Sequence, residues 1–171
     1  MGAEDGECSG GPTDGAFGTD LGWSLGVILR AWHQQVERVV ADVPHGTRGY
    51  QILSVLGRGD SPTQKGLAEH LSIDKTVMPY VIDALEDARL LARKVDAADR
   101  RVRRIVITPR GRRVLGELTT RMRTAEQALF DDVPASLRES FVTQAAQIAT
   151  TIHRAHPALN PCIAVQDALS E

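Results

Sequence analysis

The spacing of apolar residues along this chain changes from a helical period to a strand-like alternation and then back again. Before about Leu91 and after Thr108, apolar side chains recur at the spacing of one helix face. Between them, segments 91–95 and 102–107 contain β-branched residues and flank the polar segment 96–101. The pattern therefore predicts a mainly helical protein that carries one small β-hairpin.

Capping residues and helix breakers divide the helical stretches into six predicted helices. Asp20 is suited to cap the first helix, Thr63 or Ser61 the third, and Thr108 the fifth. The predicted helices cover residues 20–42, 47–56, 63–71, 74–91, 109–129 and 134–156. The third and fourth helices, joined by the tight link Ser72-Ile73, form a helix-turn-helix pattern.

A hairpin that follows a helix-turn-helix is a wing, so the expected fold class is mainly α with a small β-hairpin wing. We expect a winged helix-turn-helix region at 47–108, flanked by helical regions at 20–46 and 109–156. Residues 1–19 are rich in glycine and acids and predict a disordered N-terminal tail. Residues 157–171 contain two prolines and predict an irregular C-terminal tail.

The net charge of the 171 residues is −2, but the charges are unevenly distributed. Ten of the 20 Lys and Arg residues lie between Arg89 and Arg113, against only Asp96 and Asp99. The local net charge of this stretch is therefore +8. A local basic field of this kind is what phosphate binding requires, although a solvated run of charge is the plainer alternative.

The helix-turn-helix and the wing together predict a surface that reads duplex DNA. A recognition helix enters the major groove while the preceding helix braces it, and Val77, Val81 and Leu85 are suited to hold that helix on the core. An arginine at a wing tip can enter the narrow minor groove, and a nearby aspartate can fix its direction. The expected DNA-binding residues are Thr63, Lys75, Thr76, Met78, Pro79, Tyr80, Arg93, Asp99, Arg100, Arg101 and Arg103.

Other classes of protein are less consistent with the sequence. No apolar run approaches the roughly 18 residues of a membrane span, and the acidic start does not resemble a signal peptide, so we expect a cytoplasmic protein with no membrane partner. No nucleophile elbow, P-loop or metalloprotease helix is found, so we expect no enzyme activity, no catalytic residue and no cofactor. Cys8 and Cys162 lie in the two predicted tails and suggest neither a disulfide framework nor a redox role.

Three sequence runs stand out around the predicted wing: Leu85-Glu-Asp-Ala-Arg-Leu-Leu-Ala-Arg93, Asp99-Arg-Arg101 and Ile107-Thr-Pro-Arg-Gly111. Together with the order of elements, these runs resemble the MarR (multiple antibiotic resistance regulator) family over residues 20–156. The resemblance implies that Arg101 enters the minor groove and that Asp99 orients it. It further implies a homodimer, with 20–46 and 109–156 as the dimerisation region, which binds an inverted repeat and releases it when a small aromatic or lipophilic effector binds.

The recognition helix departs from this family at its start. The family commonly has Thr-Val-Thr-Arg where this chain has Val77-Met-Pro-Tyr80. Pro79 predicts an irregular or late first turn, and Tyr80 replaces a long cation with a polar aromatic group. Arg89 stands where a glycine usually follows the helix.

An effector pocket, if it follows the family, would need aromatic walls and polar partners. The candidates are Trp23, Arg30, Trp32, His33, Arg48 and Tyr50. Packing in the core or between subunits is the simpler explanation for the aromatic members. Two pairs, His33 with Glu37 and His153 with His156, have the spacing of metal ligands but are better explained as solvated helix faces, so we expect no metal site. A winged-helix module for protein contacts is the alternative function.

Overall fold

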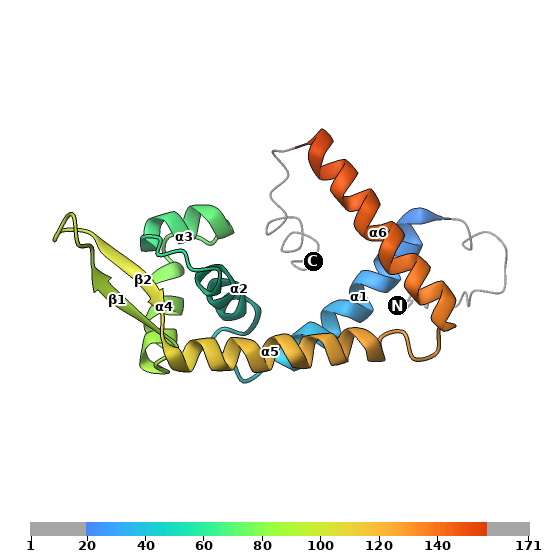
Figure 1. The fold of residues 1–171 in the computed structure, drawn as a ribbon, viewed down its shortest axis with the longest axis horizontal. Coiled ribbons are helices and arrows are strands. Elements are labelled where there is room, and N and C mark those ends of the chain that lie inside the picture. Colours follow the sequence, from blue (N-terminus) through green and yellow to red (C-terminus); the bar gives the residue numbers. More distant parts are fainter. Residues whose placement is uncertain (1–19, 157–171) are drawn as a thin grey trace, which may run out of the picture.

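The computed structural model describes residues 20–156, which form helices α1–α6 and one two-stranded sheet (Figure 1). The expectations for the tails 1–19 and 157–171, and for Cys8 and Cys162, concern residues outside this range. The elements are α1 (Leu21–Val40), α2 (Gly46–Gly57), α3 (Gln64–Leu71), α4 (Met78–Asp87), β1 (Leu91–Val95), β2 (Arg103–Ile107), α5 (Pro109–Ala128) and α6 (Ala135–Ala155). The fold class predicted from the sequence is confirmed.

The predicted N-caps of three helices are confirmed by their hydrogen bonds. The Asp20 carboxylate accepts from the main-chain N–H of Gly22 at 2.7 Å. The Thr63 hydroxyl accepts from Gly66 at 3.1 Å, so Thr63 rather than Ser61 caps α3, and the Thr108 hydroxyl caps α5 in the same way. Each bond satisfies one of the amide groups that a helix leaves free at its first turn.

Helix α4 is shorter than the predicted 74–91, and both of its ends have a physical reason. It begins at Met78 with Pro79 in its first turn, which confirms the late start expected from that proline. It ends at Asp87 because Arg89 adopts the left-handed conformation with φ 59°. The N–H of Leu90 then donates to the carbonyl of Leu85 at 2.9 Å, which closes the helix before Leu91.

The hydrophobic core lies where the last turns of α1 meet α2, α3, α4, α5 and the hairpin. The fully covered members come mostly from the helix-turn-helix region and the strands, and include Ile52, Leu53, Leu56, Leu67, Leu71, Met78, Ile82, Leu85, Leu91 and Ile105. Helix α6 contributes none of its residues to this core. The core thus fixes one lobe, which contains α2–α4 and the base of the wing.

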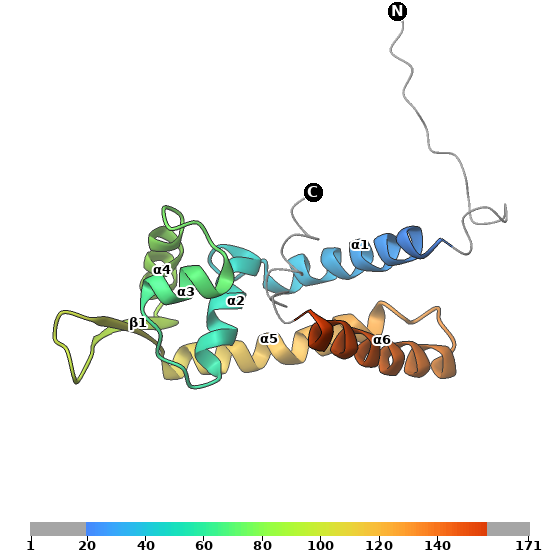
Figure 2. The ribbon, with the colours of Figure 1, turned by 90° about the horizontal axis from the view of Figure 1, so that it is seen from above.

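The wing is an antiparallel hairpin held to that lobe at its base. Leu91 pairs with Ile107 at the base, and Val95 pairs with Arg103 towards the tip. The N–H of Ile105 donates to the carbonyl of Pro62 at 2.9 Å, which joins β2 to the segment between α2 and α3. This bond leaves the base of the hairpin fixed and the tip projecting from the lobe (Figure 2).

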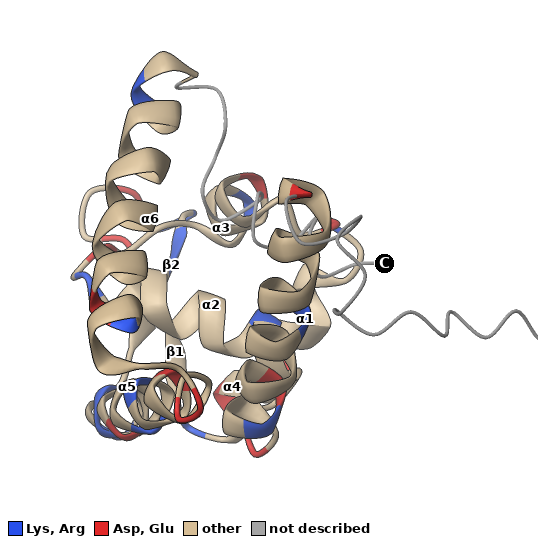
Figure 3. Cartoon of the chain, turned by 90° about the vertical axis from the view of Figure 1, so that its right-hand side faces the viewer, with Lys and Arg blue, Asp and Glu red and all other residues tan. Residues whose placement is uncertain are grey.

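The long helix α5 connects this lobe to the opposite end of the molecule, where α6 and the start of α1 lie (Figure 1). Helix α6 carries few charged residues along its length (Figure 3). Within residues 20–156, no helix is long and apolar enough to cross a membrane.

Candidate nucleic-acid interface

The segment between α3 and α4 presents polar side chains ahead of the recognition helix. Ser72 takes a left-handed conformation with φ 50°, which ends α3, and a short turn from Asp74 to Val77 leads into α4. The Asp74 carboxylate accepts from the hydroxyl of Thr76 at 2.5 Å and from its main-chain N–H at 2.6 Å. The hydroxyl bond above all lowers the pKa of Asp74. Lys75 and Thr76 are thereby held exposed beside the start of α4.

In the first turn of α4, the residues that are buried and exposed differ from the sequence-based prediction. Met78, which we expected to face DNA, is 1% exposed and belongs to the core. It lies on the same helix face as Val81, Ile82 and Leu85, at the spacing of a buried stripe, so its side chain packs in the core and is not at the exposed surface of α4. Tyr80, by contrast, is 70% exposed.

The turn at the tip of the wing is organised by two aspartates. Asp99 accepts from the main-chain N–H of Arg101 at 2.9 Å, so the bond found here fixes the backbone of Arg101 rather than its guanidinium. Asp96 accepts from the N–H of Ala98 at 2.8 Å and from Nε of Arg104 at 2.6 Å. The bond from Ala98, followed by that from Arg104, lowers the pKa of Asp96.

The side chains of three arginines of the wing take no part in these bonds. Arg100, Arg101 and Arg103 are exposed, and none of them forms an ion pair with the described residues 20–156. Arg104 differs because it pairs with Asp96 and also donates to the carbonyl of Ser61 at 3.3 Å. The wing therefore uses Arg104 in its own structure and leaves Arg100, Arg101 and Arg103 exposed.

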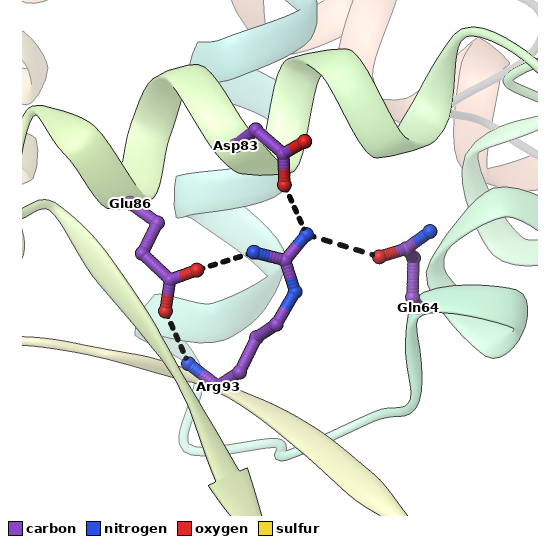
Figure 4. A network of polar contacts seen from close by, with 4 residues as sticks. All are labelled: Gln64, Asp83, Glu86 and Arg93. Carbon is purple, nitrogen blue, oxygen red and sulfur yellow. Dashed lines mark hydrogen bonds and ion pairs between the residues drawn. The ribbon is translucent and has the colours of Figure 1, made fainter.

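Arg93 on β1 has internal partners on two helices (Figure 4). Its guanidinium forms ion pairs with Asp83 and Glu86 of α4 and lies 3.4 Å from the side-chain oxygen of Gln64 on α3. Its main-chain N–H donates to the other oxygen of Glu86 at 2.9 Å. Burial works against the charge of Arg93, but the bonds to Asp83 and Glu86 prevail and raise its pKa above the ordinary arginine value. The donors of Arg93, a predicted DNA contact, are thus largely engaged within the protein.

The remaining predicted DNA contacts come from neighbouring elements of one lobe. Thr63 caps α3 and bridges to Arg104 of β2, while Pro79 is half-buried in the first turn of α4. Sequence reasoning missed Gln64, Asp83, Glu86, Asp96 and Arg104 as parts of this region. Asp83 and Glu86, three residues apart on α4, indicate that a cation lies nearby. That this cation is Arg93 follows only from the way the hairpin packs beside α4.

The six predicted pocket residues do not line one cavity. Trp32 lines a cleft of about 900 Å³ between α1, α5 and α6, next to Phe130 and Phe141. Tyr50 packs against the core from α2, and His33 lies 3.5 Å from Glu37. Trp23, Arg30 and Arg48 are exposed. Among residues 20–156, no three His, Cys, Asp or Glu side chains are grouped to hold a metal ion.

Comparisons with known proteins agree with this geometry. A model described as "MarR family" matches residues 48–102, which include α3, α4, β1 and the turn of the wing and end before β2. A comparison with curated protein sequences found no match.

Several solved structures have a similar fold, and the matches extend over most of this chain. A MarR-family transcriptional regulator from Rhodococcus sp. RHA1 is 23% identical, with a TM-score of 0.61 over 81% of this chain and 96% of its own. CouR from Rhodococcus jostii RHA1, solved with p-coumaroyl-CoA, is 25% identical, with a TM-score of 0.60 over 81% of this chain and 94% of its own. MepR, a regulator of a Staphylococcus aureus multidrug efflux pump, is 19% identical, with a TM-score of 0.66 over 78% of this chain and 98% of its own.

The helix-turn-helix, the arginine-bearing wing, the matched family model and the shared fold lead to one conclusion. Residues 48–102 of this chain match the MarR family of transcriptional regulators, and the chain has the winged helix-turn-helix fold of solved MarR-family structures.

Proposed function

We propose that the protein is a homodimeric repressor that binds an inverted-repeat operator and releases it when a small aromatic or lipophilic effector binds. The observation that carries this proposal is the exposure of Arg100, Arg101 and Arg103 on a wing beside an exposed recognition-helix start. In this arrangement α4 enters the major groove and the wing tip reaches the adjacent minor groove. The proposed DNA contacts are Thr63, Lys75, Thr76, Pro79, Tyr80, Asp99, Arg100, Arg101 and Arg103.

The apolar surface of α6 supports a dimer. In one chain this helix of 21 residues buries none of its residues, although Leu137, Ile148 and Ile152 lie at helical spacing on it. An isolated helix gains most of its stability by packing an apolar face. The start of α1 also exposes apolar side chains, including Leu21 and Leu25. A second copy of the chain would cover both surfaces and would present two recognition helices related by a two-fold axis.

The operator can be sought without knowledge of the regulated genes. Duplexes are enriched from a random-sequence pool by the wild-type protein, and the selected sequence is then titrated at two salt concentrations. We expect an inverted repeat with half-sites about one helical turn apart, and an affinity that falls steeply as salt rises. Failure to enrich any sequence, together with no salt-dependent binding, would favour a winged-helix module for protein contacts.

The cleft beside Trp32 is where we place the effector, because this aromatic side chain lines it together with apolar residues of α1 and α6 and with Phe130. CouR is a relative that has been solved both as a repressor bound to a DNA duplex and with p-coumaroyl-CoA. A ligand releases DNA only if it binds more tightly to an arrangement that cannot bind DNA. Arg30, His33, Arg48 and Tyr50 remain candidates for further contacts with the effector, whereas Trp23 is exposed and does not line the cleft.

Tryptophan variants test the place of the effector. A panel of aromatic acids and lipophilic compounds is first screened for release of the selected duplex. We expect Trp32→Leu to raise the concentration of an active compound needed for release at least tenfold. Trp23→Leu, on the same helix but outside the cleft, is the matched control. Equal responses of both variants and the wild type would place the effector elsewhere.

A further inference from the structure

The recognition helix α4 is acidic, which is unusual for an element that must lie close to phosphate groups. Between Met78 and Asp87 it contains Asp83, Glu86 and Asp87, and it has no Lys or Arg. A helix in the major groove is flanked by two rows of negatively charged phosphates. Carboxylates brought next to that field without a compensating cation would oppose binding, since like charges held together cost free energy.

Two of these three carboxylates are paired with one arginine from another element. Asp83 and Glu86 lie one helical turn apart, and the guanidinium of Arg93 on β1 pairs with both (Figure 4). The side chain of Arg93 is 28% exposed, whereas that of Asp83 is 59% exposed. The side chain of Glu86 is 36% exposed, so both carboxylates are more exposed than the guanidinium that pairs with them.

The same contacts fasten the wing to the recognition helix. Glu86 accepts from the main-chain N–H of Arg93 with one carboxylate oxygen and from its guanidinium with the other. Gln64 extends the contact to α3 at 3.4 Å. Because Arg93 lies on the first strand of the wing, the direction in which the wing leaves the lobe is coupled to α4.

We propose that Arg93 is a positioning residue for DNA binding, which offsets the charge of Asp83 and Glu86 so that α4 can approach the phosphates. It does this from within the protein and makes no contact with DNA. The proposal rests on the proposed placement of α4 in the major groove. It explains how a recognition helix without a cation of its own can serve in a DNA-binding protein.

The decisive experiment asks whether removing the acids makes the arginine dispensable. We compare wild type, Arg93→Gln, the double variant D83N/E86Q and the triple variant D83N/E86Q/R93Q in titrations of the selected duplex. Gln at position 86 can still accept from the main-chain N–H of residue 93, so the tie between α4 and β1 is preserved. Thermal unfolding and sedimentation of each variant show whether fold and assembly are retained.

We expect Arg93→Gln to weaken binding about tenfold or more, because two carboxylates are then uncompensated. The triple variant should return to within about threefold of the wild-type affinity or exceed it. An Arg93 that contacts phosphate directly would give a different result: the triple variant would stay weak and its salt slope would fall by about one. That result, or full affinity of Arg93→Gln, would overturn the proposal.

Lys94→Gln is the matched control. Lys94 is the next residue on β1, is exposed, and forms no ion pair with the described part of the chain. The effects of K94Q and D83N/E86Q should add, whereas those of R93Q and D83N/E86Q should be strongly coupled. If K94Q and R93Q show the same coupling energy with D83N/E86Q, only the total charge of the protein affects DNA binding. That result would overturn a specific role for Arg93. Binding of wild type to the selected duplex tests the proposed function separately, because it does not depend on any variant.

Discussion

Arg89 ends the recognition helix in a backbone conformation that glycine usually adopts. Its φ of 59° allows the N–H of Arg89 to donate to Glu86 at 2.8 Å and that of Leu90 to donate to Leu85 at 2.9 Å. These two bonds form the Schellman pattern that closes a helix. A left-handed conformation costs a residue with a Cβ atom about 1 kcal/mol, so the chain accepts strain at this position.

Arg89→Gly is therefore expected to raise the free energy of unfolding by about 0.5–1 kcal/mol. The greater conformational freedom of glycine in the unfolded chain reduces this gain. The adjacent Ala88 has φ −72°, so Ala88→Gly should lower stability by a similar amount. Urea unfolding at a fixed protein concentration measures both changes. A loss of stability in Arg89→Gly would show that its side chain contributes more than the strain costs.

Arg101 is the residue of the wing for which the DNA contact can be tested most directly. It is exposed at the tip, and its backbone is held by Asp99 at 2.9 Å. We expect Arg101→Ala to weaken binding to the selected duplex at least tenfold, because a minor-groove arginine is lost. Arg154→Ala removes the same charge from the end of α6 and should leave affinity unchanged. Gel-shift titration measures affinity, and sedimentation checks that assembly is unaffected; equal affinity of Arg101→Ala and wild type would contradict the assignment.

At the scale of elements, the junction between the wing and α5 depends on a close approach at Gly111. A Cβ atom at this position would lie 2.0 Å from the carbonyl oxygen of Leu90. The same region is tied by the hydroxyl of Thr108, which donates to Leu90 at 3.1 Å and accepts from Gly111 at 3.0 Å. The start of α5 is therefore packed directly onto the end of the recognition helix and the start of β1.

We expect Gly111→Ala to destabilise the protein by about 3 kcal/mol or more, since backbone on both sides must move. Gly116 lies further along the same helix, where a Cβ atom would meet nothing within 4 Å, so Gly116→Ala should stabilise by about 0.5–1 kcal/mol. Thermal unfolding of the two variants gives the comparison. Similar effects of both substitutions would mean that the approach at Gly111 is not tight in solution.

The turn of the wing should respond to acid through Asp96. Its pKa is lowered by the N–H of Ala98 first and by Arg104 next, so the charged form is the one that the folded state stabilises. This stabilisation is present above the ordinary aspartate pKa of about 3.9 and is lost as pH falls through the lowered value. We expect Asp96→Asn to be less stable than wild type at neutral pH, with the gap closing below about pH 4. Urea midpoints across this range test it, with Asp132→Asn as control, and a gap that does not change with pH would contradict it.

At the scale of the whole molecule, the DNA-binding lobe lies at one end, and α6 with the start of α1 lies at the other (Figure 1). Several of the apolar side chains at this second end are exposed in a single chain. The two ends are joined by α5 (Figure 1). On α6, an apolar stripe begins at Leu137, includes Phe141 in the cleft, and continues to Ile148 and Ile152. Ile148 is 60% exposed and Ile152 is 49% exposed. Such a stripe predicts a partner surface along the full length of the helix.

Ile148→Glu is expected to convert the proposed dimer largely to monomer, because it places a charge in an apolar interface in both subunits. Gln147→Glu adds the same charge at the adjacent exposed position and should leave the dimer intact. Analytical ultracentrifugation measures the populations, and the affinity for an inverted repeat should fall together with dimerisation. A dimer that is equally stable in both variants would show that the interface does not include this stripe.

The fold was largely predictable because its signals are local. The change of period at Leu91, the caps Asp20, Thr63 and Thr108, and the late start at Pro79 all depend on residues a few positions apart. The burial of Met78 was missed because a shift of one residue in where a helix begins changes which side chains of its first turn face the core. The end of α4 was misplaced because Leu90 and Leu91 continue the apolar pattern after the helix has ended.

By itself, the sequence determined the order of the elements, the presence of a wing with a concentrated positive charge, and the resemblance to a family of DNA-binding regulators. Only the tertiary structure decided which charges are available to a partner: Arg93 and Arg104 are paired within the protein, while Arg100, Arg101 and Arg103 are exposed. The reason is physical. Whether the side chain of an arginine is paired depends on acidic residues 7 to 10 positions away in the sequence, which the fold of the helix and the hairpin brings next to it. The local sequence pattern does not predict which of these residues will meet.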